Sequence, residues 1–251
     1  MRSYQDGRFL AAYQLDSGSL SLLDRQSHLA LYAVQDATHL PYYEDGMPLR
    51  TLLHWWLRDQ GRQLVHAAAV GNEQSAVLIV GKSGSGKSTT ALAALLAGMD
   101  YLADDYCSVA QDDEPVVYSL YNSGKVTADH LRHFPSLQPL VNNPDGLGQG
   151  EKALILLQQH FPQQIYSHLP LQSILLPTIR GQYKTELATA SKSEALRALA
   201  PSTIFQLANG GEQDFRFLSR LVEKLPTYRL LLGTELAQIP QVIQELLCTK
   251  R

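Results

Sequence analysis

The sequence contains only two cysteines and no long hydrophobic run, and each shortage excludes a class of protein. Cys107 and Cys248 lie far apart and match neither a metal-binding spacing nor a disulfide framework. Such a chain suits a reducing compartment, so we expect a cytoplasmic protein. No apolar stretch approaches the roughly 20 residues of a membrane-spanning helix, and residues 1–6 do not resemble a signal peptide. The sequence therefore predicts no association with a membrane.

The chain also lacks an excess of charge of either sign. It has 21 Lys and Arg against 24 Asp and Glu, a net charge of −3, so no basic surface for nucleic acid is expected. Hydrophobic residues make up 45% and charged residues 18% of the 251 residues, which is ordinary for a globular protein with a full core. Composition leaves a homo-oligomer open.

The first sixty residues predict a small β meander followed by an amphipathic helix. Short apolar segments separated by polar turns lie at residues 9–15, 20–23 and 29–34. From Leu49 to Leu57 the apolar residues recur at helical spacing, and we expect Trp55 and Trp56 to anchor this helix in the core. Strands and helices alternate afterwards. We therefore divide the chain into a meander-and-helix extension at 1–60 and an α/β catalytic domain at 61–251.

Residues 81–88 read G-x-x-x-x-G-K-S, the pattern of a phosphate-binding loop. The apolar residues 76–80 before it predict a buried strand, and the helix-forming residues 89–97 after it end at Gly98. Backbone N–H groups of such a loop converge on an anion at a helix N-terminus. We expect Lys87 to be a surface-facing charge that reaches the β- and γ-phosphates, and the Ser88 hydroxyl to face Mg²⁺. The candidate nucleotide contacts are Gly81, Ser83, Gly84, Ser85, Gly86, Lys87, Ser88 and Thr89.

A pair of aspartates follows one helix later, in Leu-Ala-Asp104-Asp105. The helix predicted after the loop runs antiparallel to the strand before it and returns the chain to the start of the sheet. The next short strand should therefore end beside the phosphate site. One carboxylate there can hold Mg²⁺ while the other accepts a proton from an attacking hydroxyl. A solvated turn is the alternative interpretation. The apolar residues before the pair favour a functional role.

His66 lies in an apolar run, residues 64–70, that predicts a strand joined to the next strand by a turn at 71–74. Taken alone, a histidine in such a run indicates a core residue with its hydrogen bonds satisfied.

Together, His66, the loop at 81–88 and the Asp104–Asp105 pair resemble the catalytic domain of the HPr kinase/phosphorylase family. Residues 64–109 carry nearly all of this resemblance. It implies a P-loop core related to phosphoenolpyruvate carboxykinase, with ATP and Mg²⁺ as cofactors. It also implies that Asp104 is the general base, that Asp105 supports the metal together with Ser88, and that His66 and Lys87 act beside the transferred phosphate.

The chain departs from this family after the aspartates. The family's Ile-Arg-Gly-x-Gly segment is absent, and the corresponding residues 118–126 read YSLYNSGKV. Thr89 stands where the family often has Glu. The departures predict a kinase of altered acceptor specificity rather than one directed at HPr.

The leading interpretation is an ATP-dependent kinase that phosphorylates a serine or threonine hydroxyl of a peptide or protein. A kinase of a small hydroxyl compound such as an amino acid, and a non-catalytic nucleotide-binding module, are the alternatives. Further positive charge for phosphoryl transfer is expected from Lys125, Lys152 and Arg180, whereas Lys82 should face solvent. The glycine-rich residues 142–150 are interpreted as a flap before a helix at 153–157, which would bring Lys152 to the phosphate.

Overall fold

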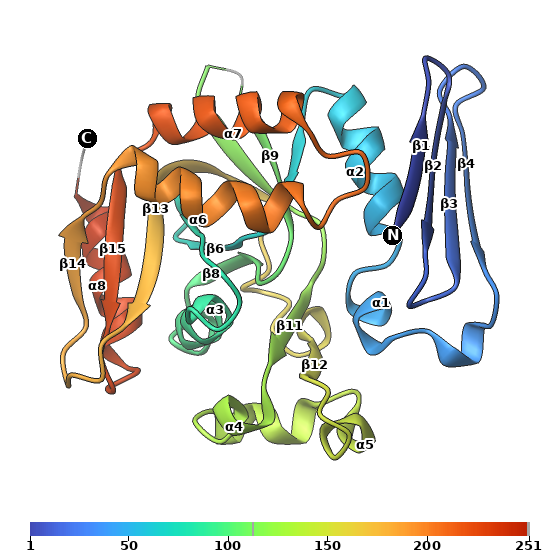
Figure 1. The fold of residues 1–251 in the computed structure, drawn as a ribbon. Coiled ribbons are helices and arrows are strands. Elements are labelled where there is room, and N and C mark those ends of the chain that lie inside the picture. The colour runs from blue at the N-terminus through green and yellow to red at the C-terminus, as the bar shows by residue number, and fades with distance from the viewer. Residues whose placement is uncertain (112, 250–251) are drawn as a thin grey trace.

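The computed structural model describes residues 1–111 and 113–249, and shows a mixed α/β fold with a central mixed sheet (Figure 1). A small antiparallel sheet lies at one side of the central sheet. A separate segment of short helices projects from the lower side of the molecule in this view. In the described part of the chain, no helix is long and apolar enough to cross a membrane.

The N-terminal meander has four strands rather than the three predicted. They pair antiparallel in the order of the sequence: β1 (Arg2–Gln5), β2 (Phe9–Gln14), β3 (Ser19–Asp24) and β4 (Leu29–Val34). The sequence did not indicate β1, because its four exposed residues are mostly polar and show no apolar alternation. The division of the chain at residue 60 stays a prediction.

Helix α2 (Arg50–Asp59) covers the inner face of the meander. Trp55 is fully buried there, and its indole N–H donates to the carbonyl of Ala208 at 3.0 Å. The prediction for Trp56 was wrong, because its side chain is 53% exposed. Successive helix residues point about 100° apart, so one of two adjacent tryptophans must leave the packed face. Between β4 and α2 lie two short helices, η1 (Ala37–His39) and α1 (Tyr42–Gly46).

The central sheet is built around the fully buried strand β7 (Ala76–Ile79). Parallel strands β13 (His168–Ile179) and β15 (Thr227–Leu232) extend it on one side, and β14 (Glu186–Thr189) pairs antiparallel with β15. On the other side β6 (Ala68–Gly71) forms the predicted hairpin with β7, and β8 (Asp100–Ala103) pairs antiparallel with β6. Because β6 is antiparallel to both β7 and β8, β8 runs parallel to β7 and ends at the same edge of the sheet.

The first residues of β13 belong to a second part of the same sheet. They pair with β10 (Pro115–Ser119), which continues through β9 (Cys107–Gln111) to β5 (Gln63–Val65). The prediction of a single strand over residues 64–70 was therefore wrong, and the break between β5 and β6 leaves His66 at the junction of the two parts.

Helices cover both faces of the sheet (Figure 1). One apolar cluster includes residues of α3 (Lys87–Leu96) and α8 (Gln238–Cys248), and a second includes residues of α6 (Lys192–Ile204) and α7 (Glu212–Lys224). The side chain of Ser191 accepts the backbone N–H of Glu194, whose carboxylate accepts the N–H of Ser191 in turn. This capping box explains why α6 begins at Lys192.

The projecting segment lies between two paired strands, β11 (Ser123–Val126) and β12 (Ala153–Leu156). It contains α4 (Ala128–Leu131), η2 (Pro135–Leu140) and α5 (Pro144–Leu147), and η3 (Leu157–Gln159) follows β12. The helix predicted at 153–157 was therefore wrong, because a short apolar run fits a buried strand equally well. The side chains of Asn142 and Asn143 accept backbone N–H groups of Leu156 and Leu154, so the interpreted flap is tied to β12.

His54, in the middle of α2, is fully buried, and neither ring nitrogen has a hydrogen-bond partner among the described residues. Burial lowers the pKa of His54 from 6.5 to about 4, against the opposing charge of Asp214. The fold therefore holds this histidine in its neutral form at neutral pH.

We expect the stability of the protein to fall below neutral pH because of this residue. The unfolded chain binds a proton at His54 below about pH 6.5 and the folded chain only below about pH 4, so the free energy of unfolding drops across this window by up to about 3 kcal/mol. His54→Leu should remove that loss, while stability near neutral pH stays equal or rises. Urea titrations of both proteins across this range measure it. An unchanged pH dependence in the variant would contradict the assignment.

Candidate active site

The glycine-rich loop at residues 81–88 leaves the C-terminal end of β7 and enters α3. Gly84 and Gly86 have φ angles of 77° and 104°, which side-chain-bearing residues rarely adopt. A Cβ atom at Gly86 would also lie 2.5 Å from Leu232 Cδ1. The loop conformation therefore depends on glycine, and it directs the N-terminus of α3 at the edge of the sheet where β8 ends.

Lys87 is 7% exposed, and not surface-facing as predicted. Its ammonium group donates to the carbonyls of Gly81 at 2.8 Å and Lys82 at 3.4 Å. Burial lowers the pKa of Lys87, while the nearby Asp105 and Asp104 act in the opposite direction. Lys82, in contrast, is exposed as expected. The loop thus holds one lysine inside the site and one outside it.

Asp104 follows β8 and is 2% exposed. One of its oxygens, Oδ2, accepts the backbone N–H of Lys125 at 2.6 Å, and the other, Oδ1, is buried without a hydrogen-bond partner among the described residues. Burial and the adjacent Asp105 raise the pKa of Asp104 to about 6, although the neighbouring Ser88 side chain acts to lower it. The carboxylate therefore lies beside the Ser88 hydroxyl with one oxygen available for a cation.

Asp105 faces a different set of groups. Its Oδ1 lies 2.9 Å from His66 Nε2, and its Oδ2 accepts from the ammonium group of Lys125 at 3.3 Å. Burial acts to raise the pKa of Asp105, but the hydrogen bond with His66 and the charge of Lys125 outweigh it and hold the pKa well below its usual range. Asp105 is therefore ionised at neutral pH, and its side chain is 29% exposed toward the pocket.

His66 and Lys125 are themselves held in place by neighbouring residues. The ring of His66 stacks on Tyr106 at 5.0 Å, and its backbone N–H donates to the hydroxyl of Thr203. Lys125 lies in β11, where its side chain is 4% exposed, and burial lowers its pKa against the opposing charge of Asp105. Both side chains are thus positioned by packing to contact one carboxylate.

These groups surround a pocket of about 300 Å³. Its lining includes the following predicted residues: His66, Ser83, Gly84, Gly86, Lys87, Ser88, Thr89, Asp105, Lys125 and Lys152. Asp104 lies behind this lining, next to Ser88. Gly81 and Ser85 line a second hollow on the α6 side of the loop. Arg180 is exposed after β13 and does not line either hollow.

Three further polar residues of the pocket carried no recognisable sequence signal. Thr127 and His130 come from the start of α4, and the His130 ring lies 3.4 Å from the Thr89 hydroxyl. Gln206 follows α6 and accepts the Tyr106 hydroxyl at 2.7 Å. They reach the pocket through the tertiary fold: Gln206 lies far in the sequence from every predicted site residue, and Thr127 and His130, which follow the candidate Lys125, belong to no motif.

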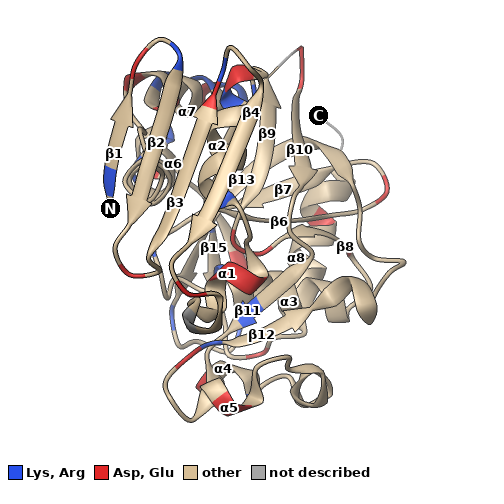
Figure 2. Cartoon of the chain, turned by 90° about the vertical axis from the view of Figure 1, so that its right-hand side faces the viewer, with Lys and Arg blue, Asp and Glu red and all other residues tan. Residues whose placement is uncertain are grey.

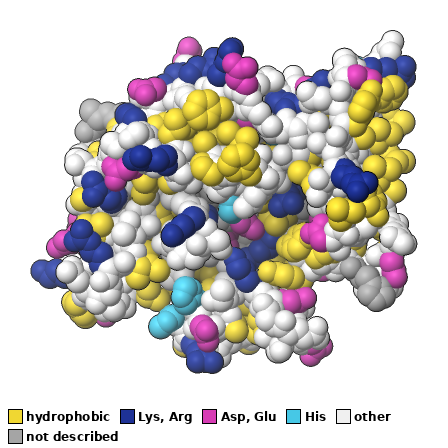
Figure 3. Space-filling model, in the orientation of Figure 1, with side chains coloured by type: hydrophobic (Ala, Val, Ile, Leu, Met, Phe, Trp, Pro, Cys, Tyr) yellow, Lys and Arg dark blue, Asp and Glu magenta, His cyan; other side chains and the backbone are white. Residues whose placement is uncertain are grey.

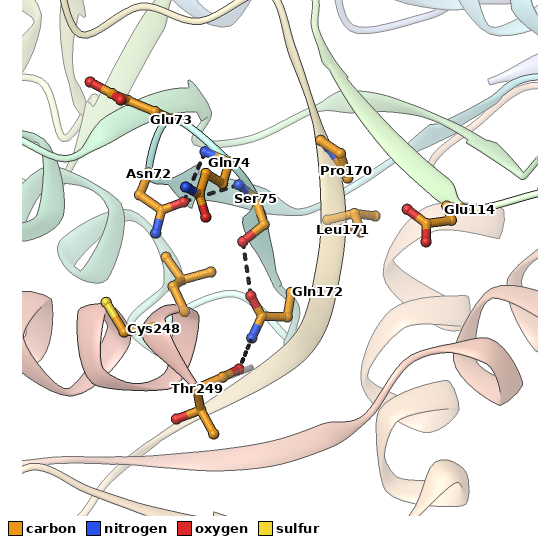
Figure 4. A pocket seen from close by; sticks show the side chains of 11 residues that line it. Asn72, Glu73, Gln74, Ser75, Glu114, Pro170, Leu171, Gln172, Cys248 and Thr249 are labelled. Atoms are coloured by element: carbon orange, nitrogen blue, oxygen red, sulfur yellow. Dashed lines mark hydrogen bonds between the residues drawn. The ribbon is translucent and has the colours of Figure 1, made fainter. Parts of the chain in front are cut away.

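A larger hollow, of about 640 Å³, lies at the opposite end of β7, beside the β6–β7 turn (Figure 4). Its polar side chains bond to one another and to the backbone: Asn72 accepts two N–H groups of the turn, and Ser75 donates to Gln172. None of the described residues that line it is basic. It therefore offers no charged partner for a phosphate, unlike the pocket of Lys87.

Among the described residues, no group of three or more His, Cys, Asp or Glu side chains is arranged to hold a metal ion by itself. A Mg²⁺ ion bound with a nucleotide needs fewer protein ligands, since phosphates and water complete its shell. Ser88 and the unpaired Oδ1 of Asp104 fit that smaller requirement.

No protein-family model matches the chain, and no curated protein matches it. A solved structure of the Hpr(Ser) kinase/phosphatase from Coxiella burnetii aligns over 73% of this chain and 93% of its own, with 13% sequence identity and a TM-score of 0.39. This likeness is too small to carry a functional argument, so we rest the function on the residues of the site.

Proposed function

We propose that the protein is an ATP-dependent kinase that transfers the γ-phosphoryl group to a serine or threonine hydroxyl of a peptide or protein. The observation that carries the proposal is that two sets of groups line one pocket. The glycine-rich loop contributes Lys87 and Ser88, and Asp105 contributes a carboxylate that contacts His66 and Lys125.

The loop residues from Gly81 to Thr89 would bind the nucleotide phosphates through backbone N–H groups and Lys87. Ser88 and Asp104 would hold Mg²⁺, which supplies charge neutralisation at the phosphates. The contacts therefore favour Asp104, rather than Asp105, as the carboxylate nearer the metal. The opposite division, which the family resemblance implies, remains the competing prediction.

Asp105 would then act as the general base. It is ionised, reaches the pocket, and can take the proton as the acceptor oxygen forms its bond to the γ-phosphorus and the bond to the β-γ bridging oxygen breaks. His66 orients the carboxylate, and Lys125 and Lys152 place positive charge along the pocket wall. ADP and a phosphorylated hydroxyl are the products.

The rim of the pocket favours a polypeptide acceptor over a small one. Phe205 is 82% exposed and directly precedes Gln206 of the pocket lining. Figure 3 shows hydrophobic side chains gathered over the α6–α7 region, beside the hollow in which a histidine and charged side chains are visible. An exposed aromatic residue at that place can contact side chains that flank a phosphorylated residue, whereas free serine is too small to reach it.

A transfer assay with ATP and Mg²⁺ tests the proposal, with three acceptors compared: serine-centred peptide libraries, free serine and none. We expect ADP formation coupled to peptide phosphorylation, and Phe205→Ser should raise KM for the best peptide about tenfold without changing ATP affinity. Phe215→Ser, on the neighbouring helix α7, serves as the matched control at an exposed phenylalanine whose sequence neighbours do not line the pocket. Phosphorylation of free serine alone would replace the proposal with a small-molecule kinase, and nucleotide binding without any transfer would overturn both.

A further inference from the structure

The outward face of the N-terminal meander is apolar across all four strands. The strand register places Tyr4, Ala11, Leu22 and Leu31 in one row across the sheet, and Tyr13, Leu20 and Ala33, with Arg2 at the end, in the next. Exposure is considerable along both rows, with 57% for Tyr4, 47% for Leu31 and 37% for Leu20. These rows, together with Leu15 and Leu29, form what we call the outer meander face.

The opposite face of the meander is already packed against helix α2. Leu10, Ala12 and Leu23 point inward and pack on Leu52 and Trp55 of α2. An antiparallel sheet with one face on the core normally presents polar residues on the other. Here the alternation brings apolar residues to both faces, so the outer meander face is not explained by the packing of this chain.

Few charged groups lie on this face: within the outward rows of the strands they are Arg2, beside Tyr13, and Asp24, beside Leu29. Figure 2 looks onto the meander and shows its charged residues at the turns and at the start of β1. Asp24, at the end of β3, is bound by Arg8, and Arg25 in the next turn is bound by Asp59. The face is therefore close to neutral, and two identical faces can meet without repulsion between like charges.

We infer that the outer meander face is the contact of a symmetric dimer, in which the sheets of two copies pack face to face. The six large exposed side chains on it leave about 600 Å² of surface if each fully exposed side chain is taken as ~200 Å². Two copies would then bury about 1,200 Å², at the lower end of the range of stable interfaces. A partner recognised by charge would need complementary charges here, and the outward rows of the strands offer only Arg2 and Asp24, of which Asp24 is already bound by Arg8.

Leu31→Glu tests the contact, with Ala30→Glu as its control. Ala30 is the exposed neighbour of Leu31 in β4, but it points to the other side of the sheet. Leu31→Glu brings like charges together across a two-fold contact and should weaken self-association at least about 100-fold, whereas Ala30→Glu should leave it unchanged. Sedimentation equilibrium of the full chain over a range of concentrations measures both.

Nucleotide affinity and the thermal midpoint show whether each variant is folded, and Leu31→Ser replaces Leu31→Glu if the charge prevents folding. A wild-type chain that stays monomeric at all concentrations would overturn the inference. Equal dissociation by Ala30→Glu, or none by either substitution at Leu31, would overturn it too. The result is independent of catalysis, because no residue of the outer meander face lines the pocket.

Discussion

Asp105→Asn should lower the rate of phosphoryl transfer by about 10²–10⁴-fold, the usual contribution of a general base, while the affinity for ATP stays nearly unchanged. The amide keeps the size of the carboxylate and can still bond His66, but it cannot accept a proton. Steady-state kinetics with a peptide acceptor, together with calorimetric titration of the nucleotide, would measure the two effects separately.

Asp104→Asn is the matched comparison, because the two carboxylates are adjacent and differ mainly in their partners. Asp104 contacts Ser88 and the Lys125 backbone, so its replacement should raise the Mg²⁺ concentration needed for half-maximal activity, since Mg²⁺ prefers an anionic oxygen. If instead Asp105→Asn changes the Mg²⁺ dependence and Asp104→Asn does not, the roles are reversed and the family-implied division holds.

The thermal midpoints of the two variants distinguish a loss of catalysis or of Mg²⁺ binding from misfolding. The raised pKa of Asp104 shows that its charged form is costly in this buried position, so the amide should leave the thermal midpoint equal or higher. Asp105→Asn removes the charge that faces the buried ammonium group of Lys125 and should lower the midpoint. Loss of activity in Asp104→Asn therefore cannot be attributed to unfolding if its midpoint is maintained.

The central strand–loop–helix and the strand ending at Asp104 could be predicted because their signals are local. An apolar strand, a glycine-rich turn, a helix and a second strand follow one another within 30 residues, so β7, α3 and β8 lie where the sequence places them. The hairpin of β6 and β7 was equally local. In such segments the spacing of the hydrophobic residues and the position of the turn residues indicate the same secondary structure.

The remaining site residues depend on contacts over long sequence distances. Gln206 reaches the pocket because α6 packs across the sheet, and His130 reaches it because β11 carries the projecting segment beside the loop. The same limit explains the wrong helix at 153–157. The first four of its five apolar residues form a strand, because β11 supplies backbone partners that no local pattern could indicate.

Burial of the charged residues could not be read from the sequence either. Lys87 belongs to a motif whose chemistry suggested exposure, yet its ammonium group bonds loop carbonyls below the surface. Lys125 was only one of several candidate cations, and its burial against Asp105 distinguishes it from the exposed Arg180. A cation held at low exposure by a carboxylate is pre-positioned, which is what stabilisation of a developing phosphate charge requires.

Lys87→Met should weaken the binding of ATP with Mg²⁺ by about 10- to 100-fold, because a hydrogen bond to a charged group contributes roughly 1.5–3 kcal/mol. Methionine keeps the aliphatic stem, which packs at the start of α3, so the change acts mainly on the charge. The ammonium group must leave the Gly81 carbonyl to reach a phosphate. Only the difference between these two partners contributes to affinity.

Lys82→Met provides the control within the same loop. Both lysines carry the same charge within five residues of each other, but Lys82 is exposed and lies outside the lining of the Lys87 pocket. Its replacement should change ATP affinity by less than about twofold, since an exposed charge is screened by water and salt. Calorimetry on the two variants therefore compares the loss of a lysine inside the pocket with the loss of an equally charged lysine outside it. Equal losses would mean that the loop attracts nucleotide only by its overall charge, and unchanged affinity in Lys87→Met would remove the phosphate-binding role from the loop.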